Sequence, residues 1–183
     1  MPCARLQLEH TALLVVDVQE KLKPHIHAAE QIVRQIGKLI DGAAALGIPT
    51  LVTEQYRKGL GRTVPELDKK LDRAVCNHEK LVFSACIEPI RQELIRQGAR
   101  TVLVCGIEAH VCVLQTCLDL IDSGFMAAVA VDAIGSRWPA DRDAAIQRMV
   151  QVGVVPTTVE SALLELVHKA GGDRFRAVLP IIK

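Results

Sequence analysis

Aromatic side chains are scarce in this sequence. Phenylalanine, tryptophan and tyrosine together make up 3 % of its 183 residues, whereas hydrophobic residues make up 50 %. The core must therefore be aliphatic. Long apolar runs are also missing, since none approaches the roughly 18 residues that a membrane-spanning helix needs. The mean hydropathy of +0.24 instead indicates buried parallel strands and a subunit surface. Together with the apolar stretch at 177–183, it predicts a homo-oligomer, dimeric or larger, with no membrane partner.

The sequence also lacks an excess of either positive or negative charge. The 22 basic and 21 acidic residues give a net charge of +1 and are spread along the chain, without the basic patch typical of a nucleic-acid binder. The amino-terminal stretch has neither signal-peptide nor transit-peptide architecture, so we expect a cytoplasmic protein. None of the six cysteines forms a Cys-x-x-Cys or Cys-x-x-His pair. We therefore expect free thiols, no metal and no cofactor.

Short apolar runs alternate with longer amphipathic segments along the whole chain. This alternation predicts an α/β protein of three layers, with a doubly wound, mostly parallel sheet and a single domain over 1–183. Capping-box patterns run from Thr63 to Glu66 and from Thr157 to Glu160. The expected strands cover 12–17, 48–53, 73–77, 101–106, 126–134 and 154–158. The expected helices cover 26–46, 87–97, 110–124, 139–153 and 158–170.

In an open parallel sheet, ligands bind beyond the carboxyl ends of the strands, where the strand order reverses. Asp17 ends the first expected strand, and Cys112 follows the fourth. If these two strands are neighbours, the two side chains face each other. Taken alone, Asp17 could equally cap a turn, and a lysine such as Lys80 is by default exposed to solvent.

Three cysteines fall within the thirteen residues 105–117. Cys105 lies inside an apolar strand, and Cys117 lies on the apolar stripe of the following helix, so both are interpreted as core residues. Cys112 lies in the first helical turn, where free N–H groups and the helix dipole are expected to lower the pKa of a thiol. Cys86 also lies near a helix start, whereas Cys3 and Cys76 have no such context.

Four stretches carry a resemblance to a known family: 13–22 (LLVVDVQEKL), 53–61 (TEQYRKGLG), 78–86 (HEKLVFSAC) and 102–124 (VLVCGIEAHVCVLQTCLDLIDSG). The sequence resembles the isochorismatase-like cysteine hydrolases over 11–153, and most of all the subgroup that is named only for its isochorismatase domain. The resemblance implies a Rossmann-like sheet of six strands in the order 3-2-1-4-5-6, in which the first and fourth strands are neighbours.

The resemblance also implies a catalytic triad of Asp17, Lys80 and Cys112. Asp17 would be the general base, Lys80 would hold the carboxylate and stabilise the thiolate, and Cys112 would attack an acyl carbon. The implied oxyanion hole consists of the backbone amides of Glu108 and Cys112, with a cis peptide bond between Ile107 and Glu108. A small molecule would be hydrolysed through a thioester.

Several alternatives about the substrate and the activity stay open. A cysteine at the nucleophile position favours cleavage of a C–N bond, of amide or carbamoyl type, over the vinyl ether that isochorismatase cleaves. Family members that hydrolyse nicotinamide have an Asp-x-His metal motif where this chain has Glu54-Gln55-Tyr56, which again indicates that no metal is bound. A catalytically idle oligomerising or binding protein that retains the fold is also compatible with the sequence.

Other residues are alternative candidates for catalysis or for substrate binding. A Cys–His hydrolase would use His78 or His110, but His110 is only two residues from the nucleophile and so points to another side of the helix. Candidates for the substrate pocket are Gln19, Tyr56 and Trp138, of which the two aromatic residues could equally fill a subunit interface.

Overall fold

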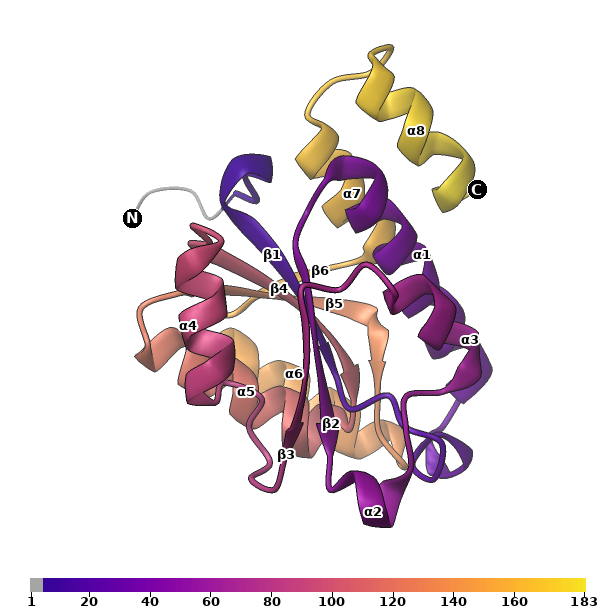
Figure 1. Cartoon of the computed structure of the whole chain (residues 1–183), viewed down its shortest axis with the longest axis vertical. Coiled ribbons are helices and arrows are strands. Elements are labelled where there is room, and N and C mark those ends of the chain that lie inside the picture. Colours follow the sequence, from indigo (N-terminus) through magenta and orange to yellow (C-terminus); the bar gives the residue numbers. More distant parts are fainter. Residues whose placement is uncertain (1–4) are drawn as a thin grey trace.

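The computed structural model describes residues 5–183 and contains one parallel sheet of six strands (Figure 1). The strand order is β3-β2-β1-β4-β5-β6, so the order implied by the resemblance is confirmed. All strands point toward the same end of the molecule, which is the lower end in Figure 1. The strands are β1 (Thr11–Val16), β2 (Thr50–Gln55), β3 (Cys76–Lys80), β4 (Thr101–Ile107), β5 (Met126–Gly135) and β6 (Val155–Thr157).

Helices cover both faces of the sheet, which makes the three predicted layers. The helices α1, α3, α7 and α8 pack on one face, and α4, α5 and α6 pack on the other (Figure 1). The helices are α1 (Ala29–Leu46), α2 (Arg57–Leu60), α3 (Pro65–Asp68), α4 (Glu88–Arg96), α5 (Leu114–Asp122), α6 (Pro139–Gln151), α7 (Val159–Val167) and α8 (Asp173–Ile182). Short 3-10 turns occur at Leu8–His10, Lys23–His25 and Lys69–Leu71, and a π-helical turn occurs at Ala109–Val113.

Successive residues of β1 supply the two apolar cores in turn, because side chains of a strand alternate between the faces of the sheet. Leu13 and Val15 join the core under α1 and α7, and Leu14 and Val16 join the core under α4 and α5. A strand that is buried on both faces reads as a continuous apolar run, which is why this strand was predictable from sequence.

Some predicted details were wrong. The third strand begins at Cys76, three residues later than expected, so that Lys80 is its last residue and not part of a loop. Thr63 does not cap α3, because its hydroxyl donates to Glu54 (2.8 Å). The second cap is shifted by one residue: Thr158 accepts from the backbone N–H of Ser161 (3.3 Å).

The carboxyl ends of β1 and β4 approach each other closely at Gly106. This glycine has φ 131°, and a Cβ atom at that position would lie 2.1 Å from the backbone oxygen of Val16. Only a residue without a side chain fits both the conformation and the contact. The segment that follows β4 is therefore brought next to the residue that follows β1, which is Asp17.

The apolar carboxyl-terminal stretch has a partner within the chain. It forms α8, which packs against α1 and α7, and Val178 is completely buried. The argument that this stretch needs a second subunit is therefore wrong. None of the helices in residues 5–183 is both long enough and apolar enough to cross a membrane.

Candidate functional site

Asp17 follows the last residue of β1 and is completely buried. Its φ of 51° lies in the left-handed region, which aspartate tolerates better than most residues. The carboxylate accepts one hydrogen bond from Thr53 Oγ1 at the end of β2 (2.8 Å) and one from Lys80 Nζ (2.6 Å). The residue therefore does more than cap a turn.

Lys80 reaches Asp17 across the end of the intervening strand β2. Its side chain is 1 % exposed, so the default expectation of a solvated lysine is wrong. Besides Asp17, its ammonium group donates to Gln55 Oε1 (2.8 Å) and to the backbone oxygens of Phe83 (2.7 Å) and Val82 (3.2 Å). A buried charge needs such a set of partners.

Cys112 lies in the π-helical turn that precedes α5, as the expected first-turn position requires. Its thiol lies close enough to Asp17, Lys80 and the backbone of Glu108 for all three to shift its pKa. The peptide bond between Ile107 and Glu108 is cis. Thr116 fixes the turn, because its hydroxyl donates to the Cys112 carbonyl (2.6 Å) and accepts from the backbone N–H of Ala85 (2.7 Å).

The electrostatics of the thiol differ from the expectation. Burial, followed by the nearby charge of Asp17, raises the pKa of Cys112 to about 12, so the expectation of a lowered pKa is wrong for the resting site. The dipole of a short helix is too weak to offset this loss of hydration. Burial also raises the pKa of Asp17, although Lys80 acts in the opposite direction.

The two neighbouring cysteines are core residues, as expected. Cys105 and Cys117 are both completely buried, and burial raises the pKa of Cys117 to about 12 and that of Cys105 still further. Neither has a charged or hydrogen-bonding partner among the causes of its shift. Only Cys112 of the three lies against a base. Cys3 lies outside the described residues.

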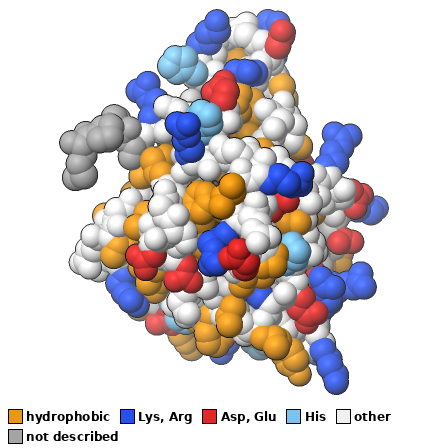
Figure 2. Space-filling view, turned by 60° about the vertical axis from the view of Figure 1, so that its left-hand side comes forward, with side chains coloured by type: hydrophobic (Ala, Val, Ile, Leu, Met, Phe, Trp, Pro, Cys, Tyr) orange, Lys and Arg blue, Asp and Glu red, His pale blue; other side chains and the backbone are white. Residues whose placement is uncertain are grey.

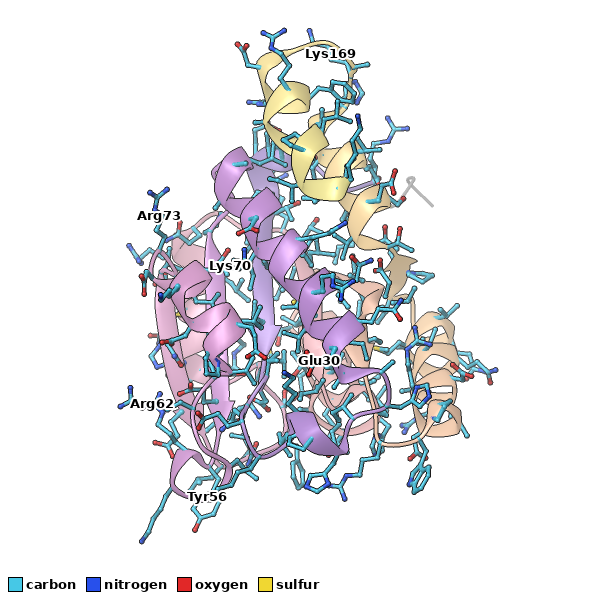
Figure 3. The ribbon with its side chains drawn as sticks, turned by 90° about the vertical axis from the view of Figure 1, so that its right-hand side faces the viewer. Glu30, Tyr56, Arg62, Lys70, Arg73 and Lys169 are labelled. Atoms are coloured by element: carbon cyan, nitrogen blue, oxygen red, sulfur yellow. The ribbon has the colours of Figure 1, made fainter. Side chains whose placement is uncertain are left out.

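The three residues suggested for the substrate pocket differ in their exposure to solvent. Gln19 is completely buried, and its amide bonds to the backbone of Gln55 and to the Gly61 carbonyl; it braces a loop and does not line an open pocket. Tyr56 and Trp138 are 48 % and 69 % exposed. Figure 3 shows Tyr56 pointing outward at the end of the molecule where the strands end.

Neither histidine contacts the thiol. Nδ1 of His110 forms a hydrogen bond with Ser136 Oγ (3.0 Å). His78 lies near Glu93 of α4 and contributes to lowering the pKa of that carboxyl group. The geometry therefore gives no support to a Cys–His pair.

Glu54 occupies the position at which the resemblance implies a metal motif in nicotinamide-hydrolysing members, and its carboxylate has three hydrogen-bond donors within the chain. Its carboxylate accepts from the backbone N–H and the hydroxyl of Thr63 (2.6 and 2.8 Å) and from Arg57 Nε (2.5 Å). Burial raises the pKa of Glu54, but these hydrogen bonds outweigh it and lower the pKa below its ordinary value. Within residues 5–183, no three His, Cys, Asp or Glu side chains are grouped so as to hold a metal ion.

Sequence reasoning missed the residues that support the triad. Thr53 and Gln55 end β2, so the strand-end rule that found Asp17 could have found them as well. Thr116 lies four residues after Cys112 and therefore on the same helical face. The ion pair of Glu108 with Arg137 (2.9 Å) joins distant segments and leaves no local signal.

Comparisons with known proteins identify the family. Residues 11–161 match the model of the isochorismatase domain. The mouse isochorismatase domain-containing protein 2A is 41 % identical over 180 residues, which cover 98 % of this chain and 85 % of that protein. A solved structure named MAR1 ribonuclease, from Caenorhabditis elegans, superposes with a TM-score of 0.93 at 42 % identity and covers 98 % of this chain and 92 % of its own.

Two YcaC structures are similar at 26 % identity. The Pseudomonas aeruginosa protein, solved with hexane-2,5-diol and covalent acrylamide, has a TM-score of 0.91 and covers 99 % of this chain and 93 % of its own. The Escherichia coli protein, described as an octameric hydrolase of unknown specificity, has a TM-score of 0.85 and covers 92 % of this chain and 85 % of its own. On its sequence, its strand order and these relatives, the chain belongs to the isochorismatase-like hydrolase family.

Proposed function

We propose that this protein is a cysteine hydrolase that cleaves a C–N bond, of amide or carbamoyl type, in a small molecule. The observation that carries the proposal is the buried ion pair of Asp17 with Lys80 beside the buried thiol of Cys112. Asp17, Lys80 and Cys112 come from three separate strand ends, and the Lys80–Asp17 distance is 2.6 Å. Such an arrangement of base, cation and nucleophile suits acyl transfer.

In the first half of the reaction, Asp17 removes the thiol proton while the sulfur of Cys112 attacks the substrate carbonyl carbon. The tetrahedral oxyanion then collapses, the C–N bond breaks, and Asp17 returns the proton to the leaving nitrogen. In the second half, Asp17 takes a proton from water, which attacks the thioester and releases the acid and the free thiol. Because burial raises the pKa of Cys112 to about 12, proton removal accompanies the attack and no stable thiolate precedes it.

The oxyanion would be held by the backbone amides of Glu108 and Cys112. The Glu108 backbone lowers the pKa of the Cys112 thiol, which supports a position of this backbone beside the reacting sulfur. Arg137 fixes the Glu108 side chain through Nε (2.9 Å) and Nη2 (3.4 Å). Loss of one donor from an oxyanion hole lowers turnover by about 10²–10³-fold, so this loop contributes as much as the side chains.

The covalent acrylamide in the Pseudomonas aeruginosa relative supports a reactive nucleophile in proteins of this kind, because acrylamide alkylates thiols. The presence of Cys112 favours C–N cleavage over vinyl-ether cleavage, since attack on a carbonyl requires a nucleophile of this type.

A panel of small primary amides, carbamoyl compounds and ureido compounds tests the proposal. Turnover should be abolished by Cys112→Ala and retained by Cys117→Ala, and intact-protein mass spectrometry during turnover should show an acyl adduct on the Cys112 peptide. Activity should survive treatment with a chelator, because the reaction needs no metal. An active Cys112→Ala protein would contradict the assignment.

Homo-oligomerisation is the second part of the proposal. Three consecutive apolar side chains are exposed next to the triad: Leu81 by 74 %, Val82 by 59 % and Phe83 by 52 %. Figure 2 shows hydrophobic side chains gathered on the surface at the lower end of the molecule. Such a patch, together with an octameric relative, supports a self-associating protein. A mass of 19.9 kDa by light scattering at micromolar concentration would exclude assembly.

Cleavage of RNA is a second candidate, because a relative 42 % identical is named a ribonuclease. Exposed Tyr56 and Trp138 are of the type on which bases stack, and Arg62 extends outward near Tyr56 (Figure 3). Against it stands the burial of Cys112, which is 5 % exposed and therefore out of reach of a large polymer. Incubation of labelled RNA with the wild-type protein and with Cys112→Ala decides between the two: RNA cleavage that depends on Cys112, without amide turnover, would favour the ribonuclease.

A further inference from the structure

Besides the triad, the carboxyl ends of β1, β2 and β3 contain two buried glutamines that no part of the proposed reaction uses. Gln19 is 0 % and Gln55 is 8 % exposed. We propose that Gln55 is a positioning residue, whose side-chain amide holds the ammonium group of Lys80 against Asp17. This inference rests on the proposed function, because it concerns the geometry of the same triad.

The side chain of Gln55 has two directed contacts. Its Oε1 accepts from Lys80 Nζ (2.8 Å), and its Nε2 donates to the backbone oxygen of Leu81 (2.8 Å). The amide is therefore oriented: its acceptor faces the ammonium group and its donor faces the chain that leaves β3. The backbone oxygens of Val82 and Phe83 contact the same ammonium group, so Gln55 and this segment together enclose it.

The contacts close into a ring through Gln19. The backbone N–H of Gln19 donates to the Asp17 carbonyl (2.9 Å). The Gln19 side chain accepts from the Gln55 N–H (2.7 Å) and donates to the Gln55 carbonyl (3.0 Å). Gln55 then contacts Lys80, and Lys80 contacts Asp17 (2.6 Å). A ring in which every member is buried and hydrogen-bonded fixes the relative positions of its members.

An amide suits this position better than the residues closest to it in shape. Methionine has about the same length but accepts hydrogen bonds poorly, so Lys80 would lose one partner. An ionised glutamate would attract Lys80 away from Asp17 and would repel the carbonyl of Leu81. With an ordinary pKa of about 4.3 and an ammonium group beside it, a glutamate at this position is ionised at neutral pH.

The test measures alkylation of Cys112 by acrylamide between pH 6 and pH 9, followed by peptide mapping. The charge of Lys80 lowers the pKa of the thiol, so a displaced ammonium group slows the reaction. Gln55→Met should slow alkylation about tenfold at every pH, which corresponds to a rise of about one unit in the thiol pKa. Gln55→Glu should slow alkylation more than Gln55→Met does, because the carboxylate both draws Lys80 away from Asp17 and adds a negative charge near the thiol. Where a substrate is found, Gln55→Met should lower kcat and leave KM unchanged.

Gln35→Met is the matched control. Gln35 donates one hydrogen bond to Asp132 (2.7 Å) on the α1 side of the sheet and belongs to no part of the triad, so its loss should leave the alkylation profile unchanged within twofold. The inference is overturned if folded Gln55→Met matches this control, or if Gln55→Glu reacts as fast as the wild type. If Gln55→Met does not fold, the glutamate variant decides alone. If the wild type hydrolyses no amide, the proposed function is refuted. The inference about Gln55 is then decided by the alkylation rates alone.

Discussion

Replacement of Lys80 by methionine should destabilise the protein by an amount that grows with pH. The side chains of Lys80 and Asp17 are 1 % and 0 % exposed, and their charged atoms are 2.6 Å apart. Lys80→Met keeps most of the length of the side chain and removes the ammonium group, with its charge and its N–H donors. A buried carboxylate then remains without its cation.

The size of the effect follows from the distance. At an effective dielectric constant of about 20, two unit charges separated by 2.6 Å attract each other by about 6 kcal/mol. The cost of desolvating both groups offsets part of this attraction, and removal of one partner from a buried pair costs about 3–5 kcal/mol. The oxygens of Gln55 and Phe83 also lose a donor, and that part of the cost does not depend on pH.

The direction of the pH dependence follows from Asp17. Its pKa in the folded protein lies above the ordinary value of 3.8, chiefly through burial, and Lys80 limits the rise. A carboxyl group with a raised pKa contributes stability that is complete below the unfolded-state pKa and is lost as the pH rises through the folded-state pKa. Without Lys80 the folded-state pKa rises further. Between the two folded-state values, the cost of the substitution should therefore grow by about 1.4 kcal/mol for each pH unit.

The assay is urea unfolding at pH 5, 6.5 and 8, at one protein concentration, for the wild type and Lys80→Met. The double variant that adds Asp17→Asn is the control, because it removes both charges and should show a cost nearly independent of pH. A cost for Lys80→Met that is equal at pH 5 and pH 8 would refute the reasoning, since Asp17 would then not depend on the charge of Lys80.

Four further substitutions have separate consequences. Cys112→Ala should abolish hydrolysis and change the unfolding midpoint little, whereas Cys117→Ala should cost about 1 kcal/mol by urea unfolding through a small cavity and keep full activity. Gly106→Ala should lower the yield of folded protein, judged by circular dichroism, because the new Cβ would lie 2.1 Å from the oxygen of Val16. Thr116→Val should cost about 1–3 kcal/mol through the unsatisfied N–H of Ala85 and should also lower kcat, because the Cys112 carbonyl loses its donor.

The helices and strands were predictable where the local sequence pattern determines them. Strand β1 and helix α1 were predicted well, because one is a continuous apolar run and the other has an apolar stripe that ends at Gly47, whose φ is 71°. Strand β3 was placed too early because it is an edge strand of alternating exposure, and its polar residues read as a loop. Helix α8 was missed, because Pro180 interrupts the pattern and the partner surface of the helix lies on distant α1.

The sequence indicated the residues of the candidate site and did not indicate their electrostatics. A strand-end position indicated Asp17 and a first-turn position indicated Cys112, but only the resemblance connected Lys80 with them. The pKa of Cys112 could not be judged from a helix start, because the decisive quantity is burial, which depends on residues from several elements. The same holds for Gln55, whose role depends on a side chain from the neighbouring strand.

Burial raises the pKa of both members of the reacting pair, Asp17 and Cys112, and the charge of Lys80 lowers both values. The ammonium group is hydrogen-bonded to the carboxylate, so it favours the ionised form of Asp17, which can accept the thiol proton. The same charge stabilises the negative sulfur that develops during attack, so displacement of Lys80 slows the reaction of the thiol. The residues that fix this one ammonium group, Gln55 foremost, thus regulate how readily the thiol reacts.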